Sequence, residues 1–149
     1  MITPFDDNHF MKQALNEAKR AFDKDEVPIG AVVVAKGQVI ARAHNLTETL
    51  NDVTAHAEMQ AITAAANYLG GKYLKDCTLY VTLEPCSMCA GALFWSQISK
   101  VVFGATDPGR GYQEKGVDLH PKTIVKQGVL AKECGDLLKL FFEGKRQSK

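Results

Sequence analysis

The sequence predicts an α/β protein, a three-layer α/β/α sandwich around a five-stranded mixed sheet. Five short apolar runs have the length and composition of buried strands. Helical patterns alternate with the later runs, and a strand that feeds a helix usually continues into a parallel neighbour. The 149 residues are 46% hydrophobic and 23% charged, which suits an ordinary globular protein. We expect a single domain over residues 1–149.

The first third of the chain predicts a helix followed by a hairpin. Apolar residues recur at helical spacing from His9 to Asp23, which is typical of a surface helix with one buried stripe. The acidic turn DKDE and Pro28 end this helix. The run IGAVVVA then predicts a buried strand, which turns at Lys36 and Gly37 into a second strand, QVIARAH.

The middle of the chain alternates helices and strands. After the polar loop NLTETLND, we expect a helix from about Thr54 to Tyr68, ended by the pair Gly70 and Gly71. The run TLYVTLE predicts a strand. A second helix is expected to open at Pro85, in the segment PCSMCAGALFW, and KVVFGA predicts another strand.

The last third begins with a long loop, Thr106 to Lys122, that is rich in glycine, proline and charge. Such loops often carry function. A short strand, TIVKQ, and an amphipathic helix from about Ala131 to Glu143 follow. The tail GKRQSK is expected to fray.

Charge and hydropathy limit the classes of protein. A formal net charge of +1 excludes a strongly basic protein, so nucleic-acid binding would need a local patch. The acidic segment MITPFDDNHF does not resemble a signal peptide, and no apolar stretch approaches the roughly 18 residues of a membrane span. We expect a soluble, cytoplasmic protein. In that reducing compartment, four cysteines indicate metal binding or catalysis before disulfides.

The segment TAHAEM places His56 and Glu58 two residues apart where the flanking pattern predicts a buried helix. A buried glutamate is costly unless it is paired, hydrogen-bonded or neutralised. Glu58 therefore needs a specific partner. A helix-capping role does not fit, because a capping box needs the acid three residues after its Ser or Thr, and Thr54 stands four before Glu58.

A metal site provides that partner. Cys86 and Cys89 lie one helical turn apart at a helix N-terminus, where the helix dipole favours thiolate over thiol. Zinc prefers thiolate and imidazole, and catalytic zinc sites use three protein ligands and leave the fourth position to water. His56 completes such a set, and Glu58 would carry protons between that water and a substrate. Regular helical geometry separates positions i and i+2, so either the first turn is irregular or the two side chains approach from opposite flanks.

The remaining cysteines and histidines have simpler interpretations. Cys77 and Cys134 are expected to pack as buried thiols. A structural four-ligand site is the rival to a catalytic one, but no second C-x-x-C closes it. His9, His44 and His120 are each conceivable as a fourth ligand, yet we expect ordinary surface or loop histidines.

The pattern H-A-E at 56–58, followed by P-C-x-x-C at 85–89, resembles the zinc-dependent nucleobase deaminases. Among these the chain is most similar to the bacterial tRNA adenosine deaminases, over nearly its whole length. The resemblance implies a cytidine-deaminase-like fold and conversion of the wobble adenosine of tRNA to inosine. It implies a homodimer whose anticodon-loop pocket is shared between subunits, and one Zn²⁺ per subunit held by His56, Cys86 and Cys89. Glu58 is then the proton shuttle.

The same resemblance assigns candidate substrate contacts. Asn45 matches an asparagine that contacts the target base, and Asp107 matches an acidic residue beside the RNA backbone. Phe141 and Phe142 point about 100° apart on a helix, so Phe142 is a candidate for contact with a base, with packing of both as the alternative. The basic residues of GKRQ match the RNA-binding end of the family or form a solvated tail.

Two departures from the tRNA enzymes keep other functions open. Phe94 and Trp95 stand where those enzymes more often have an aliphatic residue and a histidine, a pair similar to some free-base deaminases, although Trp95 has the alternative of filling the core. The loop from Thr106 to Pro121 is shorter than its counterpart in the best-known tRNA enzymes, and DPGRGY replaces their usual DxKTG. The rivals are a deaminase of free guanine or cytosine in nucleotide salvage and a non-catalytic zinc- or RNA-binding module.

Overall fold

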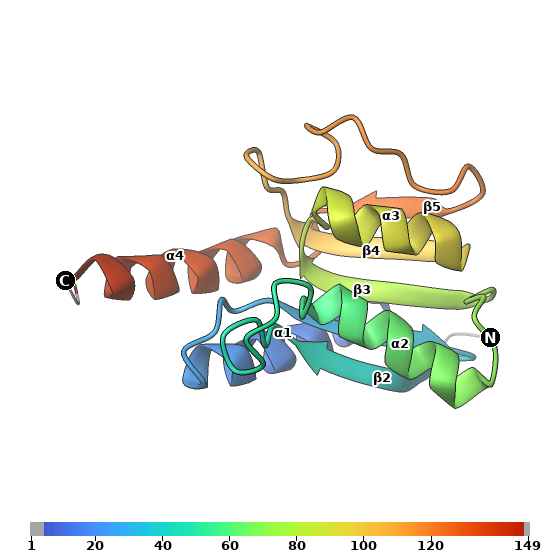
Figure 1. Ribbon diagram of the computed structural model, residues 1–149, viewed down its shortest axis with the longest axis horizontal. Helices are drawn as coiled ribbons and strands as arrows, with labels where there is room; N and C mark the ends of the chain where they lie inside the picture. Colours follow the sequence, from blue (N-terminus) through green and yellow to red (C-terminus); the bar gives the residue numbers. More distant parts are fainter. Residues whose placement is uncertain (1–4, 148–149) are drawn as a thin grey trace.

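The computed structural model describes residues 5–147 and confirms the predicted mixed five-stranded sheet (Figure 1). Its strand order is β2-β1-β3-β4-β5. The strands are β1 (Gly30–Ala35), β2 (Gln38–His44), β3 (Cys77–Leu83), β4 (Lys100–Ala105) and β5 (Ile124–Gln127). Strand β1 pairs antiparallel with β2 and β3, whereas β3, β4 and β5 run parallel. The hairpin and the parallel second half are therefore both as predicted.

Four helices complete the described part of the chain: α1 (Asp7–Asp23), α2 (Ala57–Leu69), α3 (Ser87–Ser96) and α4 (Ala131–Gln147). Alternating residues of each strand point to opposite faces, and the core divides accordingly. Val33 and its face pack with α2 and α3, while Val32 and its face pack with α1 and the start of α4. This division produces the three layers (Figure 1).

Helix boundaries differ from the sequence-based ones by a few residues. Helix α2 starts at Ala57 and not near Thr54, because His56 is its N-cap with extended backbone. Helix α3 starts at Ser87 and not at Pro85, because Cys86 is its N-cap. Helix α4 continues to Gln147, so the expected fraying of the tail is wrong as far as Gln147; Ser148 and Lys149 lie outside the described residues.

Close contact between α1 and the sheet depends on Gly30. A Cβ atom at this position would lie 2.0 Å from the carbonyl oxygen of Ala14 and 2.4 Å from the amide nitrogen of Ala18. Only glycine therefore lets the first helix settle on β1. Among the described residues, no helix has the length and apolar character needed to span a membrane.

Candidate metal centre and active site

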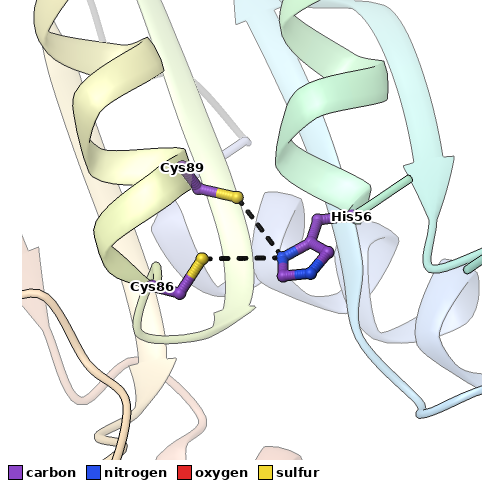
Figure 2. Close-up of side chains that lie close together, drawn as sticks. All are labelled: His56, Cys86 and Cys89. Atoms are coloured by element: carbon purple, nitrogen blue, oxygen red, sulfur yellow. Dashed lines mark hydrogen bonds between the residues drawn. The ribbon is translucent and has the colours of Figure 1, made fainter. Parts of the chain in front are cut away.

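The N-termini of α2 and α3 meet at one end of the sheet and bring three side chains together (Figure 2). His56 precedes the first residue of α2, and Cys86 precedes the first residue of α3. Cys89 lies one turn further along α3, so both sulfurs share one face. His56 Nδ1 lies 3.6 Å from Cys86 Sγ and 3.5 Å from Cys89 Sγ, and all three atoms are within 4.8 Å of one another.

These distances fit a tetrahedral zinc ion. Zn–S bonds of about 2.3 Å and a Zn–N bond of about 2.0–2.1 Å at tetrahedral angles place nitrogen and sulfur about 3.6 Å apart. The observed nitrogen–sulfur separations match this value. One imidazole and two thiols are also the donors that zinc prefers, and three ligands leave one position free. The described cluster is therefore of the open type and not the closed four-ligand type.

In the absence of a metal, the thiols of Cys86 and Cys89 have different pKa values. Hydrogen bonding from Cys89, supported by His56, lowers the pKa of Cys86 to about 4, despite partial burial. Hydrogen bonding to Cys86 and burial raise the pKa of Cys89. The partnership with Cys86 raises the pKa of His56. At neutral pH the pair thus holds one thiolate ready for a cation, and metal binding would release the proton of the second thiol.

Glu58 is the second residue of α2 and is only 4% exposed. Burial raises the pKa of its carboxyl to about 7, and the carboxyl hydrogen-bonds the Cys89 thiol. The spacing difficulty disappears because His56 lies outside the helix in extended conformation, so the i to i+2 divergence of a regular helix does not apply. His56 and Glu58 consequently line the same cavity.

That cavity has a volume of about 510 Å³, enough for a nucleoside-sized group. The floor of the cavity is formed by His56, Glu58 and Cys86, and its walls by apolar side chains and a polar loop. The lining residues are Val27, Ile29, His56, Glu58, Leu83, Glu84, Cys86, Thr106, Asp107, Gly109, Arg110, Leu138 and Phe142. Asp107 and Phe142, two of the predicted substrate contacts, are thus on the wall of the cavity.

Asn45 lies elsewhere. It is buried and is not among the lining residues, and its side-chain nitrogen donates to Glu26 Oε1 at 3.5 Å and Thr47 Oγ1 at 3.4 Å. Glu26 also accepts backbone N–H groups from Glu48 and Thr49. The contact of Asn45 with a base stays a prediction.

Other expectations need correction. His44 is not a surface histidine: it is buried, with Nδ1 3.1 Å from Glu17 and Nε2 3.1 Å from Lys24. Trp95 does not fill the core, because its side chain is 77% exposed and packs edge-on against Phe94.

The remaining residues behave more simply. Cys77 and Cys134 are buried, as expected of packing thiols. His9, near the start of α1, and His120 are both half-buried; His9 lies against Phe10, and His120 lies against Phe94. Lys145 of the basic tail pairs with Asp25 at 2.5 Å, and Arg146 is exposed.

The sequence reasoning overlooked Glu84, Arg110 and Gly111. Glu84 directly follows a buried strand and precedes the Pro-Cys pair, and it is itself buried. A charged residue at a position expected to be buried needs hydrogen-bond partners, and this requirement could have identified Glu84. Arg110 lies on the cavity wall. Its place, like that of Gly111, depends on contacts far apart in sequence, so no local pattern indicated it.

Comparisons with known proteins identify the family of the chain. Residues 5–105 match the family described as the cytidine and deoxycytidylate deaminase zinc-binding region. A tRNA-specific adenosine deaminase of Bacillus subtilis is 50% identical over 150 residues, covering 96% of this chain and 92% of the relative.

Two solved structures are similar as well. A chain from a study of A-to-I editing by tRNA A34 deaminases has a TM-score of 0.79 and 44% identity, over 87% of this chain and 98% of that one. A guanine deaminase of Bacillus subtilis has a TM-score of 0.63 and 38% identity, over 72% and 66%. The cluster of one histidine and two cysteines at paired helix N-termini, together with these matches, places the chain in the cytidine and deoxycytidylate deaminase zinc-binding family.

Proposed function

We propose that this protein is a hydrolytic deaminase that converts the wobble adenosine of tRNA to inosine. In this proposal His56, Cys86 and Cys89 hold one Zn²⁺ per subunit, and Glu58 moves the protons. One observation carries it: a buried carboxyl group stands beside an open three-ligand cluster on the floor of a nucleoside-sized cavity. A purely structural zinc site has no use for such a carboxyl group, which argues against the non-catalytic module.

The chemistry balances as addition of water and loss of ammonia. A zinc ion held by His56, Cys86 and Cys89 would supply a water molecule that ionises near pH 7. Glu58 would accept one proton of the attacking water as its oxygen bonds to C6 of the adenine, and would deliver that proton to the adjacent ring nitrogen. Glu58 would then move the second proton, from the hydroxyl group now on C6, to the exocyclic nitrogen; the bond from C6 to that nitrogen breaks, ammonia leaves and the C6 carbonyl of inosine forms.

The walls of the cavity suit a nucleotide in a single-stranded loop. Such a base is unstacked at little cost and is recognised by stacking and by phosphate and base-edge contacts. Phe142 is 45% exposed and offers an aromatic ring, and Arg110 brings a guanidinium group to the same cavity. We assign substrate contacts to Phe142 and Asp107 on this basis, and to Asn45 on the family resemblance.

Deamination of free guanine or cytosine is the second candidate, supported by the similarity to a guanine deaminase. The aromatic pair Phe94 and Trp95 suggested this function from the sequence. Neither residue lines the cavity, so the pair no longer supports it. Bases without a phosphate chain would also leave Arg110 without an anion to bind.

The test is to incubate zinc-loaded protein with bulk tRNA and, separately, with free adenine, guanine and cytosine. We expect inosine at the wobble position at enzyme-like rates and no ammonia from free bases. Glu58→Ala should retain the metal and lose deamination by about 10³-fold, within the range for removal of a general acid–base. Ammonia from guanine or cytosine with unchanged tRNA would replace the first candidate by the second. Full activity of Glu58→Ala would refute the assigned role.

We also propose a cytoplasmic homodimer, with residues 1–149 as one deaminase domain. Support for a dimer comes from a groove of about 810 Å³ along α2 and from large apolar side chains exposed near it or on the neighbouring α3: Leu50, Val53, Tyr68, Leu69 and Trp95. Monomeric proteins rarely expose such a set without a partner. Sedimentation equilibrium should show twice the chain mass, and Trp95→Glu should shift the population toward monomer. A wild-type monomer at micromolar concentration excludes the dimer.

A further inference from the structure

We propose that Glu84 is a positioning residue that holds the substrate-facing loop 106–113 against the metal-ligand segment; this inference rests on the proposed function. Glu84 directly follows β3 and is 4% exposed. Its Oε1 accepts the backbone N–H of Asp107 at 2.9 Å. Its Oε2 accepts both the backbone N–H and the side-chain amide of Gln113 at 3.1 Å. The carboxylate therefore binds both ends of the loop.

The loop closes tightly around this carboxylate. A Cβ atom at Gly111 would lie 2.3 Å from Glu84 Cδ and 2.4 Å from each carboxylate oxygen, so the backbone passes directly over the acid. Gly111 also forms an isolated antiparallel bridge with Cys86, and the Tyr112 amide donates to the Pro85 carbonyl at 2.9 Å. The loop is thus attached to the same three residues, 84–86, that end in a metal ligand.

This attachment fixes two side chains on the cavity wall. Asp107 accepts the backbone N–H groups of Gly109 and Arg110 at 3.2 Å, which shapes the turn between the two anchored ends. Asp107 and Arg110 face the cavity, and neither has a regular element to hold it. Their placement relative to Cys86 therefore depends on Glu84.

Glu84 is not an alternative proton carrier. Both of its oxygens accept N–H donors, and all three donors belong to the loop, to Asp107 and Gln113. Glu58 instead forms hydrogen bonds with its own backbone and with the Cys89 thiol. The two buried acids consequently have separate roles, with proton transfer assigned to Glu58 and loop geometry to Glu84.

The test compares Glu84→Gln with Glu114→Gln, an exposed acid on the same stretch of chain. In the active protein we expect Glu84→Gln to raise KM for an anticodon stem-loop about tenfold, with kcat within about threefold and the zinc content unchanged, because one amide oxygen cannot replace two carboxylate oxygens. Hydrogen exchange without RNA should accelerate in residues 106–113 and not in α2 or α3. Glu114→Gln should match wild type in all four measurements.

Gly111→Ala perturbs the same contact from the other side and keeps the charge of Glu84. It should reproduce the rise in KM, whereas Gly135→Ala, whose Cβ would meet only Ala105 at 4.0 Å, should not. A stability role alone would lower the melting temperature and leave KM of the folded protein unchanged, which would overturn the proposal.

Binding of the stem-loop to the Glu58→Ala protein separates the two claims. If that protein binds the stem-loop and its Glu84→Gln derivative binds equally well, Glu84 has no positioning role and the proposed function stands. Failure of Glu58→Ala itself to bind, together with wild-type inactivity on tRNA, would remove the proposed function and the role of Glu84 with it.

Discussion

The floor and the rim of the cavity are built in different ways. On the floor, His56, Glu58 and Cys86 are placed by the first residues of two helices that pack on the sheet. On the rim, Arg110 lies on a loop and Phe142 lies in the second half of α4. The C-terminal end of α4 extends beyond the sheet (Figure 1). Two helix N-termini next to the sheet place the groups proposed to react, whereas a loop and the distal half of α4 place the groups proposed to meet the substrate. Such a division lets substrate preference change while the chemistry is retained.

Replacement of a floor ligand should have the largest effect. Cys86→Ser exchanges a thiolate for a hydroxyl group, which zinc binds weakly, so we expect loss of the metal and a fall in kcat/KM of about 10³-fold or more. Metal content by mass spectrometry and the rate of inosine formation measure the two effects. Chelation of wild-type zinc should produce the same loss, and added zinc should restore wild type but not the variant.

Cys134→Ser makes the same chemical change outside the floor. Cys134 is buried on α4 next to Gly104, so its replacement should lower the free energy of unfolding by about 1–2 kcal/mol and leave the zinc content intact. Equal metal loss in both variants would contradict the assignment of Cys86 and Cys89 as the zinc ligands.

The sequence predicted the floor because its signals are local. His56 and Glu58 are neighbours in sequence, and so are Cys86 and Cys89, and each pair stands beside a recognisable helix start. The strands were found for the same reason, since their apolar runs need no distant partner. Helix starts at Thr54 and Pro85 were placed too early, because the N-cap residues are His56 and Cys86.

The rim was only partly predictable because it depends on distant contacts. Glu84 meets Asp107 and Gln113, which lie 23 and 29 residues further along the chain. The buried ring of His44 contacts Glu17 of α1 and Lys24 at the end of α1, which lie 27 and 20 residues earlier in the chain. No pattern within a short window records such pairings, so residues of this kind were overlooked or assigned to the surface.

The adjacent residues Phe141 and Phe142 provide a smaller and sharper test of the comparison. Phe142 lies on the rim and is 45% exposed, whereas Phe141 is 7% exposed and packs edge-on against Phe22. Stacking of a base on an aromatic ring contributes about 1–3 kcal/mol, so Phe142→Ala should weaken stem-loop binding about 5- to 150-fold. Its free energy of unfolding should change by less than about 1 kcal/mol. Fluorescence anisotropy and urea unfolding measure these quantities.

Phe141→Ala should give the opposite result. Removal of a buried phenylalanine typically costs about 3 kcal/mol of stability, and its ring is turned about one helical step away from the cavity. The affinity of the folded protein for the stem-loop should then remain within about threefold of wild type, because Phe141 packs against Phe22 and does not face the cavity. If Phe141→Ala weakened RNA binding and Phe142→Ala lowered stability, RNA recognition would depend on the packed core of the protein. Substrate preference could then not change without a change in the packing that also holds the reacting groups.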